Sequence, residues 1–260
     1  MVVAPSAERD VAEAVAAAPH ARLVPSDVPL LAGDARNLGV RESRCQIIAF
    51  IDADCTPDPG WLSAAVAAMK DGVMLAGGPV LDALCWHPVA PIDNLLQFAE
   101  QGPRRPDGEA TYLPGCNLVL RRTTFAELGG FPAGVAIIED VELSLSAVAR
   151  NPRALRFVQG MRVRHRGRVR LHDFWRHQET FGYVRGRTAR FLTRRLQQLG
   201  ARPALAPFVI LKRLMHITAR TAQWNPLGLV RIALLLPVVL LGLTAWARGF
   251  QRGCREAMGR

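Results

Sequence analysis

Short apolar runs alternate with alanine-rich amphipathic stretches over about the first 83 residues of the chain. Strands are predicted at residues 2–4 and 22–24, and the continuous apolar run at 46–51 is typical of a strand buried on both faces. The helices expected between and after these strands span residues 7–18, 35–44 and 59–69. This alternation predicts an α/β fold in which helices cover a mostly parallel sheet.

The pattern is less regular after residue 84. A helix is predicted at residues 92–101, a turn-rich loop follows it, and the apolar run at 117–120 indicates another strand. The remaining predicted elements are helices at 123–128 and 139–149, short strands at 156–158 and 161–163, and a long basic helix at 171–198 that breaks near Gly182 or Gly186.

The charge of the chain is strongly basic and unevenly distributed. Its formal net charge is +11, and 15 arginines lie between residues 150 and 202, where the acidic residues are Asp173 and Glu179. Such a segment suits an anionic membrane surface, although a solvated basic face without a partner remains open. Zinc-finger spacing and RNA-binding aromatic signatures are absent from the sequence, which argues against nucleic acid as a partner.

Cysteine usage and the first residues indicate a cytosolic compartment. The five cysteines are scattered and form no Cys-x-x-Cys pair, so they are expected to be reduced thiols. No basic region followed by an apolar core is visible at the N-terminus, so no signal peptide is expected.

The most apolar stretch, residues 227–247, is the candidate membrane span. Its 21 residues would give about 31 Å of helix, and its Leu, Ile and Val residues outweigh the cost of Arg231, which lies near one end. A helical hairpin bent near Pro237 and Gly242 remains an alternative. Upstream, residues 203–218 fit either a helix lying in the membrane interface or a buried amphipathic helix.

Two carboxylates follow the apolar run at 46–51, in the triplet Asp52-Ala53-Asp54. Ligands of parallel α/β sheets bind at the carboxyl ends of the strands, where these residues are expected. Paired carboxylates suit a divalent cation shared with substrate phosphates, which suggests a nucleotide-diphosphate site. The alternative is that the two acids only end the strand and cap the following helix.

Three further segments accompany this triplet. They are residues 33–39, with Arg36 and Asn37; residues 115–122, leading to the turn at 129–131; and residues 138–143, followed by His165. In this order and spacing, the segments resemble the inverting glycosyltransferases of family 2, which have the GT-A fold. The resemblance covers about residues 2–190, and the basic helix and apolar C-terminus resemble the membrane-associated members.

The resemblance implies a role for each matching residue. Asp140 would be the catalytic base, with Glu139 beside it, and Mg²⁺ or Mn²⁺ would be the cofactor. The metal ligands would be Asp54, Asp52 and His165, and the donor-binding residues would be Arg36, Asn37, Asp52, Gly115, Cys116 and Asn117.

Each of these residues also has a purely structural interpretation. Glu139 and Asp140 could be acids favoured by the dipole at a helix start, Arg36 could be a helix-surface residue, and His165 could be an exposed strand residue. The chain also opens on what resembles the second strand of the family, without the usual first strand and helix. A Rossmann-like GT-A fold that is incomplete at its N-terminus would leave an apolar sheet edge.

The sequence therefore predicts a glycosyltransferase domain at residues 1–200 and an interfacial and membrane-spanning or hairpin segment at 201–260. The predicted enzyme, hexosyltransferase-like, transfers a sugar with inversion from a nucleotide-sugar, a UDP-sugar rather than a GDP-sugar, to a hydroxyl acceptor. That acceptor would be lipid-linked or a polysaccharide. Membrane lipids are expected partners, with the catalytic domain on the cytoplasmic side of the inner membrane. The alternative is an inactive membrane scaffold that keeps the fold.

Overall fold

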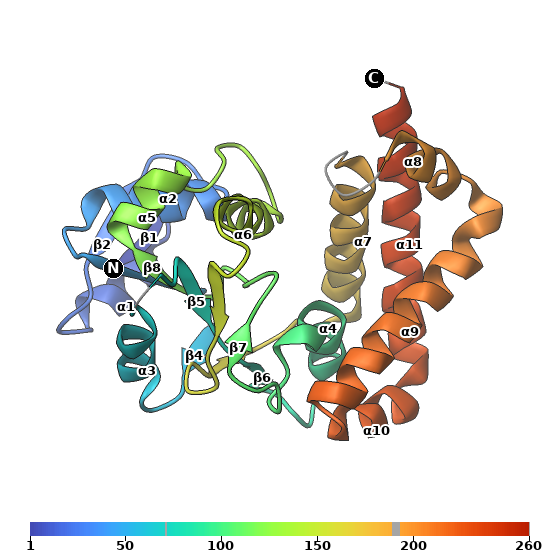
Figure 1. Cartoon of the computed structure of the whole chain (residues 1–260), viewed down its shortest axis with the longest axis horizontal. Helices are drawn as coiled ribbons and strands as arrows, with labels where there is room; N and C mark the ends of the chain where they lie inside the picture. The colour runs from blue at the N-terminus through green and yellow to red at the C-terminus, as the bar shows by residue number, and fades with distance from the viewer. Residues whose placement is uncertain (71, 189–192, 260) are drawn as a thin grey trace. The chain divides into compact units, whose positions relative to one another are not determined.

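The computed structural model describes residues 1–70, 72–188 and 193–259, which form two compact units (Figure 1). Unit 1 comprises Met1–Asp52, Pro59–Gly78 and Asp107–Met161, and unit 2 comprises Ala53–Asp58, Pro79–Pro106 and Arg162–Arg260. These units do not follow the predicted ranges 1–200 and 201–260, because the chain crosses between them several times. A functional division at residue 200 stays a prediction.

The main sheet of unit 1 is mixed, with the strand order β3-β8-β5-β9-β7. Its strands are β3 (Ile47–Ile51), β8 (Asn117–Arg121), β5 (Leu75–Gly77), β9 (Leu155–Phe157) and β7 (Gly108–Glu109). Only the β5–β9 pair is parallel, and β8 runs antiparallel to both of its neighbours. The α/β class is therefore confirmed, but the predicted mostly parallel sheet is wrong, because β8 inserts between β3 and β5 in the opposite direction.

Strand β3 lies at the edge of this sheet. Strands β1 (Val2–Pro5) and β2 (Leu23–Ser26) pair in parallel as a separate two-stranded sheet, and in the described parts of the chain β3 pairs with β8 alone. Side chains of β3 alternate between buried and more exposed positions, with Ile48 and Phe50 buried. The predicted burial on both faces is therefore wrong, because an edge strand is covered less completely.

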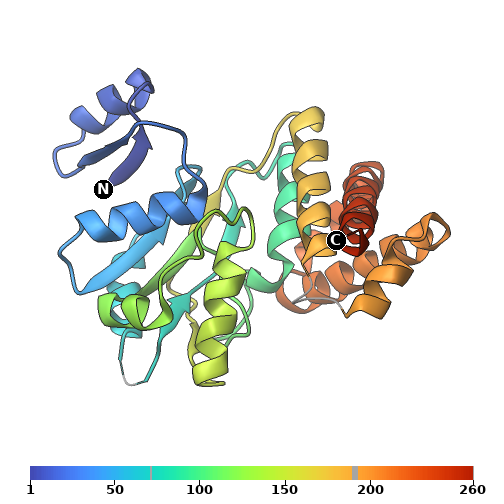
Figure 2. The ribbon, with the colours of Figure 1, turned by 90° about the horizontal axis from the view of Figure 1, so that it is seen from above.

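Helices cover both faces of the main sheet in unit 1. Helices α2 (Ala32–Glu42), α5 (Arg122–Leu128) and α6 (Glu139–Arg150) lie on one side, and α3 (Trp61–Ala68) lies on the other (Figure 1). Helix α1 (Arg9–Ala16) connects β1 to β2 (Figure 2). The core between the first three helices and the sheet is apolar and includes Val40, Phe50, Leu118, Phe125, Leu143 and Phe157.

Unit 2 combines a three-stranded sheet with a helical bundle. The sheet has the order β4-β10-β6, formed by β4 (Cys55–Pro57), β10 (Val163–His165) and β6 (Val80–Asp82). The helices are α4 (Ala90–Phe98), η1 (Ala99–Gln101), α7 (Leu171–Arg187), α8 (Arg194–Gly200), η2 (Pro203–Leu205), α9 (Ala206–Trp224), α10 (Leu227–Leu234) and α11 (Leu236–Met258). Their shared core includes Ile92, Phe174, Ile217 and Leu243.

Helices α7 and α11 lie side by side in both views, at a distance that only glycine allows (Figures 1 and 2). A Cβ atom at Gly182 or Gly186 of α7 would collide with the backbone of α11, and one at Gly249 or Gly253 of α11 would collide with the backbone of α7. Such small-xxx-small pairs let two helix backbones approach closely. Of the two predicted positions for a break, Gly182 is wrong and Gly186 is right to within one residue. Helix α7 ends at Arg187, and residues 189–192 of the predicted long helix lie outside the described residues.

The predicted membrane span is not one helix. Within the described ranges no single helix has both the length and the apolar composition to cross a bilayer. Helices α10 and α11 meet the criteria only when taken together, and they are bent by 84°. Pro237 lies in the first turn of α11, where a residue without a backbone N–H is tolerated.

Candidate functional site

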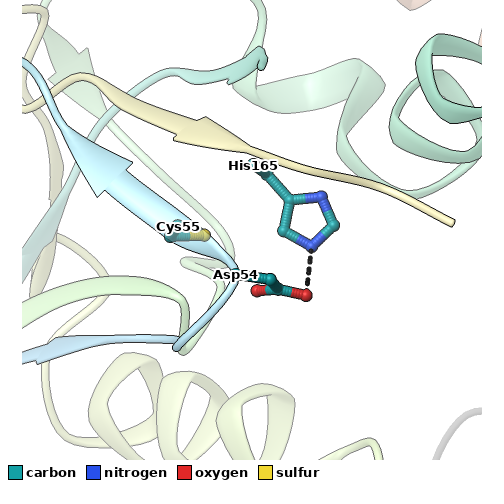
Figure 3. A group of neighbouring side chains, drawn as sticks. All are labelled: Asp54, Cys55 and His165. Carbon is teal, nitrogen blue, oxygen red and sulfur yellow. Dashed lines mark ion pairs between the residues drawn. The ribbon is translucent and has the colours of Figure 1, made fainter. Parts of the chain in front are cut away.

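Strand register in unit 2 brings together residues that are far apart in the sequence. Strands β4 and β10 pair antiparallel with Cys55 opposite His165, and the N–H of Arg166 donates to the backbone oxygen of Asp54 at 2.9 Å. As a result, one ligand atom each from Asp54, Cys55 and His165 lies within 4.8 Å of the other two (Figure 3). Nε2 of His165 is 3.3 Å from Oδ2 of Asp54.

Asn94 of α4 fixes the imidazole of His165. Its Nδ2 donates to Oδ1 of Asp82 and to the backbone oxygen of His165, so its Oδ1 is the atom that faces Nδ1 of His165, at 2.6 Å. The neutral ring therefore carries its proton on Nδ1, although the N–H of Gly167 also lies 3.2 Å from that nitrogen. The contact with Asn94 is the shorter of the two. It leaves the Nε2 lone pair facing Asp54.

His165 is 3% exposed, so its interpretation as an exposed strand residue is wrong. When the ring is protonated, Nε2 donates to Asp54, and this hydrogen bond lowers the pKa of the Asp54 carboxyl despite partial burial. Asp54 is therefore ionised over the physiological range. An ionised carboxylate next to an imidazole held through its other nitrogen is the arrangement found around metal ions in proteins.

The donor set fits a divalent cation. A carboxylate suits Mg²⁺ and Mn²⁺, an imidazole suits later transition metals, and the Cys55 thiol adds a soft ligand on the same side. Asp52, the third predicted metal ligand, belongs to unit 1 and pairs there with Arg36. Within unit 2 the candidate ligands are thus Asp54, His165 and Cys55.

A buried carboxylate holds the segment that follows His165. Asp93 of α4 is fully buried, accepts from the N–H of Arg168 at 3.0 Å, and accepts from Nε2 of Gln178 on α7 at 3.0 Å. Burial opposes its ionisation, but His177 and Arg168 outweigh that effect and lower the pKa of Asp93. The chain after β10 is therefore tied to two helices. This restricts the positions available to His165.

Arg36 is the centre of a charge network in unit 1. Its guanidinium bridges Asp52 at 2.6 Å and Glu139 at 2.7 Å, and it packs over the ring of Phe131. Burial alone would lower the pKa of Arg36, but the two carboxylates reverse this and raise it. Arg36 is thus not a helix-surface residue. It joins the end of β3 to the start of α6.

Asp140 lies beside this network with a perturbed acidity. It is buried, its Oδ2 accepts from the phenol of Tyr112 at 2.9 Å and from the N–H of Gly115 at 2.8 Å, and its Oδ1 accepts from the N–H of Val141. Burial and the neighbouring Glu139 raise the pKa of Asp140 to about 6, against the opposing effect of the hydrogen bonds. A carboxyl group with a pKa near neutrality is suited to proton transfer.

The other predicted donor-binding residues have structural contacts. A Cβ at Gly115 would lie 2.7 Å from Arg36 Nη1, so a larger residue there would displace the guanidinium. The amide of Asn37 makes two hydrogen bonds to the backbone of Phe131. Asn117 is fully buried, accepts from the indole of Trp61 and donates to the backbone of Met161, and Cys116 is buried next to it. Donor contacts by these four residues stay predictions.

Sequence reasoning missed three residues of these constellations. Tyr112 reaches Asp140 across 28 positions, Asn94 orients His165 across 71 positions, and Cys55 joins the metal cluster. Only Cys55, directly after the acidic triplet, carried a signal in the sequence.

Comparison with known proteins finds a family match for the first half of the chain. Residues 5–129 match the family model described as "Glycosyl transferase family 2". These residues belong to glycosyltransferase family 2. The matched range holds Arg36, Asp52, Asp54 and Tyr112, and it ends before Asp140 and His165, whose roles stay predictions.

Curated relatives agree with this family. Over 154 residues the chain is 28% identical to the "Pre-mycofactocin glycosyltransferase" of Mycobacterium tuberculosis, a match that covers 57% of this chain and 33% of the relative. Over 99 residues it is 28% identical to "Glycosyltransferase AglE" of Haloferax volcanii, covering 38% of this chain and 32% of the relative. The chain thus spans about a third of the length of the relatives it matches.

One solved structure shares the fold. It is described as "Mannosyltransferase PcManGT from Pyrobaculum calidifontis in complex with GDP-Man and Mn2+", with a TM-score of 0.51 and 18% sequence identity. The match covers 94% of this chain and 72% of that chain. At this identity the likeness shows the GT-A fold alone, which confirms the predicted fold family.

Proposed function

We propose that the chain transfers a sugar, with inversion, from a nucleotide-activated donor to a hydroxyl acceptor at the cytosolic face of a membrane. The observation that carries the proposal is Asp140, a buried carboxyl group with a pKa of about 6 at the start of α6. Support for the reaction class comes from the family match of residues 5–129 and from the curated glycosyltransferase relatives.

Asp140 serves as the general base. Its carboxylate accepts the proton of the acceptor hydroxyl while that oxygen attacks the anomeric carbon of the donor, and the nucleoside diphosphate departs from the opposite side. A single displacement of this kind inverts the configuration at the anomeric carbon. Tyr112 and Gly115 hold Oδ2 of Asp140, which directs the lone pairs that remain.

Asp54 and His165, with Cys55 beside them, would hold the divalent cation. When bound, the cation neutralises charge on the departing diphosphate. The imidazole in the donor set favours Mn²⁺ over Mg²⁺, which prefers oxygen ligands throughout. Asn94 holds the proton of His165 on Nδ1 and so leaves the Nε2 lone pair facing Asp54.

Arg36 and Asp52 form the donor-binding part of unit 1 in this proposal. Their ion pair is half open to solvent on the Asp52 side, where the side chain is 41% exposed, whereas Arg36 is 12% exposed. An exposed carboxylate held by a buried guanidinium can accept hydrogen bonds from the ribose hydroxyls of a nucleotide. A UDP-sugar is the proposed donor, and a lipid-linked or polysaccharide hydroxyl is the proposed acceptor.

The test uses two substitutions with matched controls. Asp140→Asn and Asp54→Asn should each abolish nucleotide release from radiolabelled UDP- and GDP-sugars, whereas Glu142→Gln in the first turn of α6 and Asp58→Asn after the acidic triplet should retain it. Calorimetric titration with UDP or GDP in the presence of Mn²⁺ reports donor binding separately. Unchanged turnover in both Asn variants would refute the proposal, and a wild-type chain without any metal-dependent nucleotide binding would favour an inactive scaffold.

A further inference from the structure

We propose that unit 2 attaches to one leaflet of an anionic membrane through exposed apolar faces of α9, α10 and the start of α11, without crossing the bilayer. The inference deepens the membrane location in the proposed function by naming the surface and the lipid charge. It does not depend on sugar transfer, because lipid binding and catalysis use different residues.

Helix α9 is apolar on two separate faces. One face, which includes Leu214, Ile217 and Ile210, packs into the core of unit 2. The other face exposes Phe208, Leu211 and Met215, with Phe208 65% and Met215 63% accessible. The exposed positions follow one another at i, i+3 and i+7, which places them on a single stripe. A soluble helix needs only one apolar stripe, so the second calls for an apolar partner.

Helices α10 and α11 carry exposed apolar residues as well. Leu227, Val230 and Leu234 also lie at i, i+3 and i+7, and Leu227 and Leu234 are 73% and 76% accessible. After the 84° bend, Leu236 and Leu240 are also exposed, at i and i+4. We call Phe208, Leu211, Met215, Leu227, Val230, Leu234, Leu236 and Leu240 the apolar elbow. Eight exposed apolar side chains on three successive helices indicate an interaction site.

Charge decides which partner fits the apolar elbow. Unit 2 holds 22 of the 33 basic residues and 8 of the 22 acidic ones, for a formal charge of +14, whereas unit 1 carries −3. Residues 180–255 contain thirteen basic residues and no acidic residue. In the structure Glu100 pairs with Arg220 of α9 and Asp82 pairs with Arg231 of α10. The positive charge that remains on unit 2 is complementary to a bilayer with anionic headgroups.

The second half of α11 stays outside the bilayer in this proposal. Its glycines pack against α7, and Arg248 and Arg252 form ion pairs with Glu179 of α7 at 3.6 and 3.1 Å. Tyr183 of α7 also donates to Glu256 at 2.6 Å. A charged pair of tightly packed helices does not suit hydrocarbon. Only the apolar elbow enters the leaflet, as in an interfacial helix.

The experiment is co-sedimentation of the chain with vesicles of phosphatidylcholine, with and without about a third of phosphatidylglycerol. The wild-type chain should sediment with the anionic vesicles, less with the neutral ones, and less as salt rises. The triple variant Phe208→Gln, Leu227→Gln, Leu234→Gln should lose about tenfold or more in partitioning.

The matched control is Leu62→Gln, Val66→Gln on α3 of unit 1, two residues that are 66% and 50% exposed. It removes exposed apolar surface elsewhere and should sediment like the wild type. Thermal unfolding by circular dichroism verifies that both variants fold. If the triple variant does not fold, the single variant Leu234→Gln replaces it.

Four results would overturn the proposal. The first two are a wild-type chain that stays in the supernatant and a folded elbow variant that sediments like the wild type. The third is resistance of the bound chain to alkaline carbonate extraction, which indicates a membrane span. The fourth is a dimer in light scattering that the elbow variant abolishes, in a chain that does not bind lipid, which indicates a second copy as the partner. Asp140→Asn should sediment like the wild type. Loss of transfer with intact sedimentation, or the reverse, therefore separates failure of the reaction from failure of the attachment.

Discussion

The phenolic oxygen of Tyr112 donates a hydrogen bond of 2.9 Å to Oδ2 of Asp140. The same carboxylate oxygen accepts the N–H of Gly115 at 2.8 Å. Burial and Asp140 both raise the pKa of Tyr112 well above its ordinary value, so the phenol stays a donor at all pH values of interest. Tyr112 thus favours the charged form of Asp140 and opposes the larger effect of burial.

The first prediction concerns the pH dependence of transfer. A general base must be ionised, so the rate should rise with pH through about 6, the pKa of Asp140, and level off above it. Tyr112→Phe removes a hydrogen bond to the ionised form, so its acidic limb should move to higher pH. Tyr183→Phe, in the other tyrosine of the chain, is the control. An acidic limb that Tyr112→Phe leaves in place would contradict the role of Tyr112 as a positioning residue.

A second prediction links Asp140 to stability. Its pKa in the folded chain, about 6, lies above the ordinary 3.8, so the protonated form favours folding below about pH 4 and this contribution is lost as pH rises through 6. Asp140→Asn removes this dependence. The free energy of unfolding of the variant minus that of the wild type should therefore increase from pH 4 to pH 7, by on the order of 1–3 kcal/mol. Urea unfolding at both pH values measures the difference, and a constant difference would contradict the raised pKa.

The third prediction concerns the metal cluster of unit 2. His165→Ala removes one of the clustered ligands, so Mn²⁺ binding measured by calorimetry in the presence of UDP should weaken at least about tenfold. His172→Ala is the matched control. Its Nδ1 also lies 3.3 Å from a carboxylate, that of Asp173, but it is exposed and stands outside the cluster. Equal Mn²⁺ affinity in the two variants would exclude His165 as a ligand.

The fourth prediction concerns the contact between α7 and α11. A Cβ at Gly249 would collide with the backbone oxygen of Glu179, so Gly249→Ala must separate the helices. We expect a loss of about 1–3 kcal/mol or more in the free energy of unfolding, measured by urea denaturation. Gly259→Ala, whose Cβ would lie 3.9 Å from the backbone oxygen of Glu256, should change the free energy of unfolding little. Equal stability of the two variants would mean that the helices separate without cost.

Local pattern predicted most individual elements. The helices around residues 35–44, 59–69 and 139–149 and the strands at 46–51 and 117–120 are present as α2, α3, α6, β3 and β8, within a few residues. The short strands β4, β5, β6 and β7 were missed, and the equally short β9 and β10 were predicted one and two residues out of place, because two or three residues carry little periodicity. The apolar run at 227–247 predicted helix correctly, but the 84° bend depends on how α10 and α11 pack against α4 and α9.

By itself, the sequence determined the acidic triplet after β3, the chemical types of the candidate ligands and base, and the concentration of positive charge, since these are properties of residues and their order. Only the tertiary structure decided the partners. Asp52 pairs with Arg36 and Glu139 shares that guanidinium, whereas Asp54, two positions after Asp52, meets His165 across the β4–β10 register. The reason is physical: pairing between strands more than a hundred positions apart is fixed by packing and backbone hydrogen bonds, and a local pattern does not contain it.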